Sequence, residues 1–272
     1  MYLYINEEEY SKMNLSLQGK TYVVMGVANK RSIAWGIARS LHEAGARLIF
    51  TYGRERTEKS VRQLVESLET TDSIILQCDV TSDEQIHSCF SKIKEEVGTI
   101  HGIAHCVAFA NKEELSGEFL NVTREGFLLA QNISSYSLSA VAKEVKNLEL
   151  MSEGGSFVTL SYLGGERVMT NYNVMGVAKA SLEASVKYLA SDLGKYGIRV
   201  NSISAGPIRT LSAKGVSDFN TILKEVEEKA PLRRVTTQEE VGDTAVFLFS
   251  EMSRGITGEN IHVDSGYHII GY

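Results

Sequence analysis

Residues 21–36 read Thr21-Tyr22-Val23-Val24-Met25-Gly26-Val27-Ala28-Asn29-Lys30-Arg31-Ser32-Ile33-Ala34-Trp35-Gly36, and they contain the sharpest structural signal in the chain. The first five are apolar, aromatic or β-branched, which predicts a short buried strand. From Ile33 onward, apolar residues recur every four positions at Ile37 and Leu41, which predicts an amphipathic helix. Gly45 ends this helix, because glycine accepts the left-handed backbone that often follows a last helical turn. The stretch therefore predicts a strand, a tight turn and a helix.

The same alternation continues to the end of the chain. Apolar, β-rich runs predict strands at residues 21–25, 47–52, 73–78, 102–109, 155–161, 199–205 and 261–264. Helical periodicity predicts helices at residues 33–44, 56–68, 83–97, 127–146, 173–193 and 238–250. Ser82 and Gln85 predict a capping box at the start of the third of these helices.

Strands as apolar as these are typical of a parallel sheet that helices cover on both faces. Right-handed connections then give a doubly wound α/β layer of the Rossmann type, with about seven strands. No Pro- or Ser-rich linker and no internal repeat divides the chain, so we expect a single domain over residues 13–272. Residues 1–12, which are acidic and poor in apolar side chains, are expected to be an N-terminal extension outside the fold.

Composition and charge narrow the classes of function. The chain has 272 residues and a net charge of −6 at pH 7, so it lacks the basic excess that a nucleic-acid-binding face requires. No run approaches the roughly 18 to 20 apolar residues of a membrane span, and the acidic start is unlike a signal peptide. The three cysteines form no CxxC pair, which disfavours a disulfide framework and a zinc site. We therefore expect a cytoplasmic protein with no metal, nucleic-acid or membrane partner.

The turn after the first strand has the composition of a phosphate-binding turn. A dinucleotide site needs small residues that let the backbone approach the pyrophosphate, followed by a helix N-terminus. Gly26, Ala28 and Gly36 meet the first need, and Ser32 with Ile33 begins the helix. Because the usual GxGxxG spacing is absent, a plain β–α turn with Gly36 at a helix–sheet contact is the alternative.

Two further positions bear on a nucleotide. Asp79 follows the third strand, where a carboxylate could bind the adenine amino group or simply begin the next turn. After the second strand, where NAD-specific enzymes place an acidic ribose ligand, the chain has Gly53 and Arg54. Arg54 or Arg56 could meet a 2′-phosphate, or both could be solvated charges at the start of a helix.

Tyr172 and Lys179 are the candidate catalytic pair. They lie about two helical turns apart, so they share a face of the expected helix. They also follow the fifth strand, and the ligand crevice of a doubly wound sheet lies at the carboxyl ends of its strands. A nearby ammonium would lower the tyrosine pKa from about 10, so that the pair could handle a proton or stabilise an oxyanion. By spacing alone, a surface lysine and a tyrosine at the edge of the core fit equally well.

Taken together, these features resemble a known family. A Tyr-x6-Lys pair in this place is typical of the short-chain dehydrogenase/reductase superfamily. More specifically, residues 26–36, 162–179 and Ala205-Gly206-Pro207-Ile208-Arg209-Thr210 resemble the enoyl-[acyl-carrier-protein] reductases of bacterial type II fatty-acid synthesis. The resemblance spans about residues 15–267 and extends to departures from the superfamily pattern. His105-Cys106-Val107-Ala108-Phe109-Ala110 stands where an Asn-Asn-Ala-Gly motif would be, and Tyr162 replaces the serine expected ahead of the catalytic tyrosine.

The resemblance implies reduction of the trans-2 double bond of an enoyl thioester, with hydride entering at the β-carbon and charge developing on the thioester oxygen. It places Tyr172 at that oxygen, Lys179 at the nicotinamide ribose, and Tyr162 in the acyl pocket as a third catalytic residue. The implied cofactor contacts are Gly26, Ser32, Ile33, Asp79, Val80, Val107, Lys179, Ile208, Arg209, Thr210, Leu211 and Ser212, and the implied substrate contacts are Ala110, Tyr162 and Tyr172.

The resemblance also implies a cofactor, a partner and an assembly. The cofactor is NADH, with NADPH as the alternative, and the partner is acyl carrier protein bearing an enoyl thioester. A homotetramer is expected, which agrees with small and apolar residues on more than one face of residues 174–189. Candidate basic contacts for the acidic carrier protein are Lys214, Lys224, Arg233 and Arg234.

Two other functions fit the same fold. A carbonyl (3-oxoacyl) reductase is disfavoured by the missing serine and the Tyr162/Tyr172 pair. A non-catalytic NAD(P)-binding regulator is disfavoured by the intact pair of Tyr172 and Lys179.

Residues 209–220, which mix Gly215 with small polar and a few apolar residues, are expected to form a mobile flap that orders over bound ligands. A static helix packed on the domain is the alternative.

Overall fold

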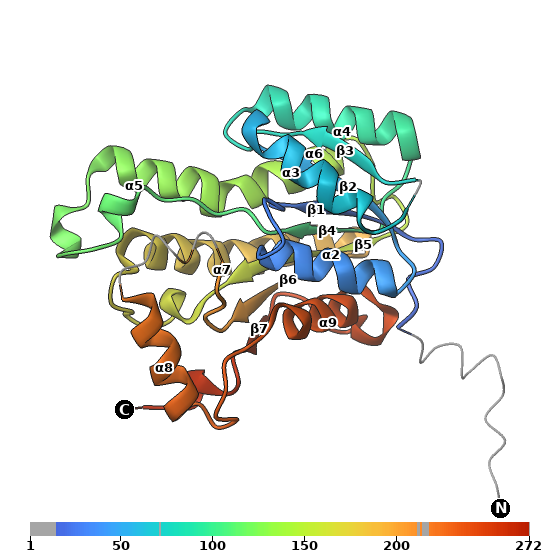
Figure 1. Ribbon diagram of the computed structural model, residues 1–272. Helices are drawn as coiled ribbons and strands as arrows, with labels where there is room; N and C mark the ends of the chain where they lie inside the picture. Colours follow the sequence, from blue (N-terminus) through green and yellow to red (C-terminus); the bar gives the residue numbers. More distant parts are fainter. Residues whose placement is uncertain (1–14, 71, 211–212, 214–217, 272) are drawn as a thin grey trace, which may run out of the picture.

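The computed structural model describes residues 15–70, 72–210, 213 and 218–271, and in them helices cover both faces of a parallel sheet (Figure 1). The sheet has seven strands in the order β3-β2-β1-β4-β5-β6-β7. The strands are β1 (Thr21–Met25), β2 (Arg47–Tyr52), β3 (Ile74–Gln77), β4 (Gly102–His105), β5 (Gly155–Ser161), β6 (Ile198–Ala205) and β7 (Asn260–Val263). Every neighbouring pair is parallel, which confirms the doubly wound Rossmann-type fold.

The helices form two layers. Helices α2 (Ile33–Glu43), α3 (Glu55–Glu66) and α9 (Gln238–Phe249) cover one face, and α4 (Asp83–Val97), α6 (Ser137–Asn147) and α7 (Asn173–Leu193) cover the other. Alternate residues of β1 point to opposite layers: Tyr22 and Val24 pack into one core, Val23 and Met25 into the other, and all four are fully buried. This alternation in a central strand explains why its sequence is continuously apolar.

Two further helices lie toward the same side of the molecule in Figure 1, α5 (Arg124–Gln131) and α8 (Phe219–Lys229). Single 3₁₀ turns connect the larger elements, at Lys112–Glu114, Phe119–Asn121, Leu163–Gly165, Gly194–Tyr196, Glu251–Ser253 and Tyr267–Ile269. Helix α8 was not expected from the sequence.

Two local predictions are wrong in detail. The fourth strand ends at His105 rather than at residue 109, because beyond Cys106 the chain leaves the sheet and lines a cavity. The helix expected at residues 127–146 begins at Arg124, where Thr123 caps it, and a π-helical turn, η4 (Asn132–Tyr136), divides it into α5 and α6.

The capping box expected at α4 is only half formed. The Ser82 hydroxyl accepts a hydrogen bond from the Gln85 N–H, as expected. The Gln85 side chain does not return to Ser82, however, because its Oε1 accepts from the Asp79 N–H at 3.1 Å. The complete capping box lies instead at α9, between Thr237 and Glu240. The N-terminal extension expected at residues 1–12 lies outside the described residues.

Candidate active site

A cavity of about 530 Å³ opens where the loops after β1, β4, β5 and β6 meet the start of α7 and helix α8. It brings together ten of the residues expected in the site, namely Gly26, Ser32, Ile33, Val107, Ala110, Tyr162, Tyr172, Lys179, Ile208 and Thr210. Asp79, Val80 and Arg209 are described but do not line it, and Leu211 and Ser212 lie outside the described residues. The carboxyl-end crevice of the sheet is therefore where most of the expected residues converge.

The glycines of the phosphate-binding turn are required by close packing. Gly26 has φ +92°, and a Cβ there would lie 2.1 Å from the carbonyl oxygen of Cys106. A Cβ on Gly36 would lie 2.7 Å from the Cβ of Gln238, so Gly36 serves a contact between α2 and α9 rather than the helix–sheet contact considered above. The Ser32 hydroxyl accepts hydrogen bonds from the N–H groups of Ala28 and Asn29, both at 3.1 Å. The turn thus holds a polar group at the N-terminus of α2.

The two tyrosines and the lysine meet at the start of α7. Tyr172 occupies the N-cap position, and its ring packs edge-on against Tyr162, with centroids 4.8 Å apart at 71°. A Cβ on Gly164 would lie 2.4 Å from the Tyr172 ring, so this glycine makes room for it. Lys179 is buried, and its Nζ donates to the carbonyl oxygen of Leu160 at 2.7 Å. The expected shared face of Tyr172 and Lys179 is thus turned into the cavity.

The expected lowering of the Tyr172 pKa by the lysine is wrong in this structure. Burial raises the pKa of Tyr172, and Tyr162 and Glu183 raise it further. Burial also lowers the pKa of Lys179 to about 8. Tyr172 is therefore a phenol at neutral pH. A phenol can donate a hydrogen bond to a developing oxyanion, so Tyr172 can still take the oxyanion role expected from the sequence.

His105, at the end of β4, is fully buried behind the cavity. Its Nδ1 lies 3.1 Å from the Thr159 hydroxyl and its Nε2 lies 2.9 Å from the Ser137 hydroxyl. Burial lowers its pKa to about 3, so the imidazole is neutral at physiological pH. It joins β4, β5 and α6 and does not line the cavity. Cys106, the next residue, does line the cavity, and burial raises its pKa to about 12.

Asp79 is engaged in its own turn. Its Oδ1 accepts hydrogen bonds from the Thr81 N–H at 2.9 Å and from the Thr81 hydroxyl at 2.8 Å. This is the turn-forming alternative raised by the sequence. Both of these hydrogen bonds go to Oδ1, so the other carboxylate oxygen of Asp79 does not take part in the turn.

Several lining residues were missed by sequence reasoning. The missed residues Leu115, Met169, Met175 and Ile222 form part of the apolar wall, whereas Phe219 falls in the segment that was expected to close over the ligands. Met175 lies three positions after Tyr172 on the same helix, so helical spacing could have pointed to it. Phe219 and Ile222 belong to α8, which reaches the cavity through tertiary contacts that no local pattern encodes.

The expected flap at residues 209–220 is described only in part, because residues 211–212 and 214–217 lie outside the described residues. Thr210, Ala213 and Phe219 line the cavity, and Arg209 donates to the Asn220 Oδ1 at 2.7 Å. These described residues therefore lie at the cavity, while the mobility of the segment stays a prediction.

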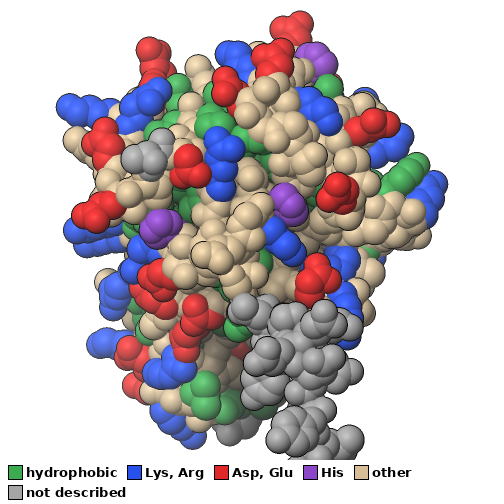
Figure 2. All heavy atoms as spheres, turned by 90° about the vertical axis from the view of Figure 1, so that its right-hand side faces the viewer, with side chains coloured by type: hydrophobic (Ala, Val, Ile, Leu, Met, Phe, Trp, Pro, Cys, Tyr) green, Lys and Arg blue, Asp and Glu red, His purple; other side chains and the backbone are tan. Residues whose placement is uncertain are grey.

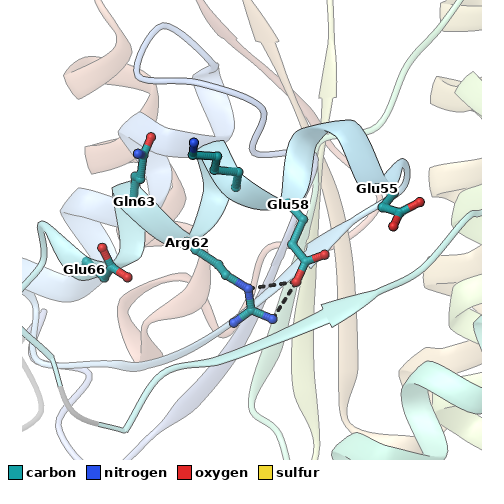
Figure 3. Close-up of a pocket in the computed structure, with 6 residues that line it drawn as sticks. Glu55, Glu58, Arg62, Gln63 and Glu66 are labelled. Atoms are coloured by element: carbon teal, nitrogen blue, oxygen red, sulfur yellow. Dashed lines mark hydrogen bonds and ion pairs between the residues drawn. The ribbon is translucent and has the colours of Figure 1, made fainter.

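A second hollow of about 450 Å³ lies on the outer face of α3. Its lining comes from that one helix, and Arg62 turns back onto Glu58 in an i,i+4 ion pair at 2.7 Å (Figure 3). It brings together no side chains from distant parts of the chain, so it has no features of a site.

The face shown in Figure 2 carries Lys, Arg, Asp and Glu side chains interspersed, without a large area of one sign. Within residues 15–70, 72–210, 213 and 218–271, no group of three or more His, Cys, Asp or Glu residues could hold a metal ion. In the same ranges no helix is long and apolar enough to span a bilayer.

The family model for enoyl-(acyl carrier protein) reductase matches residues 26–268. The chain belongs to this family. The reductase [NADH] FabI of Bacillus subtilis is 76% identical over 257 residues, covering 94% of this chain and 99% of the relative. The corresponding Bacillus cereus reductase [NADH] is 73% identical over 255 residues, with the same shares of both chains.

Solved structures agree with this assignment. The crystal structure of the Bacillus cereus enoyl-acyl carrier protein reductase with NADP⁺ and indole naphthyridinone matches with a TM-score of 0.93 and 72% identity, covering 96% of this chain and all of that one. The family, the enoyl reduction in fatty-acid elongation and the use of a nicotinamide cofactor, as expected from the sequence, are thereby confirmed.

Proposed function

We propose that the cavity is the catalytic centre of an enoyl-acyl-carrier-protein reductase, with Tyr162, Tyr172 and Lys179 as its catalytic residues. The observation that carries this proposal is the convergence of all three side chains, with the turn after β1, in one cavity at the carboxyl ends of the strands. Nicotinamide cofactor supplies the hydride when bound. The glycine at residue 26 and the helix N-terminus at Ser32 fit the phosphates of such a group, because backbone can approach there and the helix dipole favours negative charge.

The side chains divide the work as follows. Tyr172, a phenol because of its burial, donates a hydrogen bond to the thioester oxygen as negative charge develops there. Lys179 keeps its ammonium fixed against Leu160, where it can hold the ribose and stabilise the same charge. Tyr162 holds the Tyr172 ring edge-on and lines the acyl pocket, in contacts worth about 0.5–1.5 kcal/mol beyond simple burial. The apolar wall made by Leu115, Met175 and Phe219 excludes water from the enolate.

Steady-state kinetics test the function directly. The purified chain is expected to oxidise NADH, followed by its absorbance, when crotonyl thioester is added, and to leave a 3-oxoacyl thioester unreduced. Reduction of the 3-oxoacyl substrate instead would identify a carbonyl reductase. Tight NADH binding without turnover of either substrate would identify a regulator.

We propose NADH as the preferred cofactor, which the names of the two Bacillus relatives support. NADPH is the alternative, because the Bacillus cereus structure holds NADP⁺ and because Gly53 and Arg54, rather than an acid, directly follow β2 in this chain. Arg54, at that point, lies with its guanidinium 5.2 Å from the centroid of the Phe109 ring. The same assay with NADH and NADPH side by side decides, since the preferred cofactor gives the higher kcat/KM.

We propose that the enzyme is a cytoplasmic homotetramer that acts on enoyl thioesters of acyl carrier protein. Large apolar side chains are exposed on neighbouring helical segments: Leu128 is 59% exposed, Tyr136 54% and Tyr188 77%. Exposed apolar surface of this kind is typical of subunit interfaces. Light scattering after gel filtration is expected to give four times the 30.0 kDa chain mass, and a monomer mass would contradict the assembly.

Of the basic side chains expected to contact the carrier protein, two already bind to groups within the chain. Arg234 pairs with Glu240, and Arg233 donates to the carbonyl oxygen of Glu228. Lys214 lies outside the described residues. Lys224, on α8 next to the cavity, is therefore the candidate that we retain for the acidic carrier protein.

A further inference from the structure

The π-helical turn η4 separates α5 from α6, and this turn together with the first residue of α6 places three serine hydroxyls in the interior. Ser134 and Ser137 are fully buried and Ser135 is 3% exposed. A buried hydroxyl needs hydrogen-bond partners, and each of these three finds one on another element. Because π turns inside helices are often found at functional sites, the partners of these serines are informative.

Ser134 bonds twice to one residue of the loop after β4. Its Oγ accepts from the Phe109 N–H at 3.0 Å and donates to the Phe109 carbonyl oxygen at 3.1 Å. The single hydroxyl proton is thus used, and both backbone groups of Phe109 are satisfied by one side chain.

Other hydrogen bonds give the backbone of this loop little support, while the side chains of Val107 and Phe109 pack against the hydrophobic core. Val107, Ala108, Phe109 and Ala110 all line the cavity. After the Cys106 N–H bond to the Met25 carbonyl, the described residues 107–110 make no backbone-to-backbone hydrogen bond. Where the chain leaves the sheet for the cavity, the Ser134 hydroxyl therefore makes the backbone hydrogen bonds that a neighbouring strand would otherwise make.

The neighbouring serines have different partners. The Ser135 hydroxyl lies 2.8 Å from the hydroxyl of Ser181 on α7. The Ser137 hydroxyl donates to the Ile133 carbonyl at 2.6 Å and contacts His105. Neither of them bonds to residues 107–110, so within the same turn only Ser134 reaches the cavity loop.

We propose that Ser134 is a positioning residue of the reductase reaction: its hydroxyl fixes the backbone of Phe109 and so holds residues 107–110 in the shape that binds cofactor and substrate. Ser134 touches no reacting atom and acts through the loop. The proposal rests on the binding roles given above to Val107 and Ala110.

Two matched variants test it. Ser134→Ala removes both bonds to Phe109, whereas Ser135→Ala removes a buried serine hydroxyl from the same turn without touching the loop. From the ordinary contribution of two hydrogen bonds, S134A is expected to raise the Kd for NADH and the KM for crotonyl thioester by about fivefold to thirtyfold. Its kcat should change by less, and S135A should keep all three constants near those of the parent.

Constants in S134A that match those of S135A would overturn the proposal. So would a loss confined to kcat, since that would place the effect on the chemical step rather than on binding. If the parent enzyme itself failed to oxidise NADH with crotonyl thioester, the proposed function would fail instead, so the two failures are distinguishable.

A measurement on the unaltered enzyme does not depend on how a variant folds. In hydrogen exchange followed by NMR or mass spectrometry, the Phe109 amide is expected to be protected to the level of the β4 amides without any ligand present, although it lies outside the strand. Rapid exchange of this amide in the parent enzyme would show that Ser134 does not hold the loop, and would overturn the proposal.

Discussion

The chemistry proposed for this enzyme depends on two side chains whose ionisation is set by burial. Tyr172 and Lys179 have opposite charges in their ionised forms, yet burial drives both toward neutrality, raising the first pKa and lowering the second. Tyr172 is then a neutral phenol and the Lys179 ammonium lies near its pKa, so a new charge in the site would shift the protonation of both groups. The negative charge of an enolate would favour the protonated form of both groups.

Substitution of Tyr172→Phe keeps the ring that packs on Tyr162 and removes only the hydroxyl. We expect kcat to fall by about 10² to 10⁴, because general-acid and oxyanion contributions have this size, while the Kd for NADH stays unchanged. Steady-state kinetics and NADH fluorescence titration measure the two effects. Tyr196→Phe, at an exposed tyrosine that does not line the cavity, is the control. A Tyr172→Phe enzyme with near-parental turnover would remove Tyr172 from the mechanism.

Lys179→Ala is expected to weaken NADH binding and to lower turnover together, because one ammonium serves both the ribose and the oxyanion. A loss of turnover by about 10² or more is typical for one preorganised electrostatic group. Lys187→Ala, an exposed position two turns further along α7, is the matched control. Unchanged cofactor affinity in Lys179→Ala would show that the ribose role is wrong.

The pH dependence follows from the lowered pKa of Lys179, about 8. The ammonium is present below this pKa and is lost above it, so kcat/KM for the free enzyme should be level toward neutral pH. It should then fall as the pH rises through about 8. A profile that stays flat to pH 9.5 would contradict a requirement for the Lys179 ammonium.

At the scale of elements, one side of the cavity is lined by α8 and by described residues that follow β6, among them Thr210 and Ala213. Phe219 and Ile222 of α8 line the cavity, whereas α8 buries only Leu223 and Val226 as core residues. An element with so small a buried face has little free energy holding it against the domain. This agrees with closure that depends on a bound ligand.

Hydrogen exchange tests the flap over residues 209–220. Its amides are expected to exchange fast in the free enzyme and to become protected in a complex with cofactor and an enoyl thioester, because closure would bury their backbone. Amides of β6, which lie in the centre of the sheet, serve as the internal standard. Strong protection already present in the free enzyme would favour the static helix.

At the scale of the whole molecule, the parallel sheet is what assembles the site. Because every strand runs in the same direction, the loops after β1, β4, β5 and β6 emerge at one edge. Residues from Gly26 to Ile222 are thereby gathered around one cavity. The first described strand, β1, begins at Thr21, and we expect residues 1–12 to be dispensable for this arrangement.

A chain that starts at Met13 is therefore expected to melt at the same temperature as the full chain and to show the same turnover. The acidic, apolar-poor sequence of residues 1–12 offers little surface to bury, so its removal should cost the fold little free energy. Differential scanning calorimetry and the NADH assay on both chains measure this. A clear drop in either would mean that the extension packs on the domain.

The sequence by itself determined the order and kind of most elements, the parallel sheet and the pair of Tyr172 and Lys179. These depend on periodicity and on turn residues, which are local properties of the chain. The family also departs from the superfamily pattern, in the glycine spacing that begins at Gly26 and in Tyr162, which stands in place of a serine. These departures could be recognised because they lie in contiguous motifs.

Only the tertiary structure decided where β4 ends, why Gly36 must be glycine, and that Tyr172 is a phenol. Each of these depends on a residue far along the chain: the Ser134 hydroxyl that replaces the strand ladder, the Gln238 side chain 2.7 Å from a Cβ at Gly36, and the surroundings that desolvate the Tyr172 ring. Contacts across such separations leave no periodic trace in the sequence. Burial, which sets both packing and pKa, exists only once the layers have been brought together.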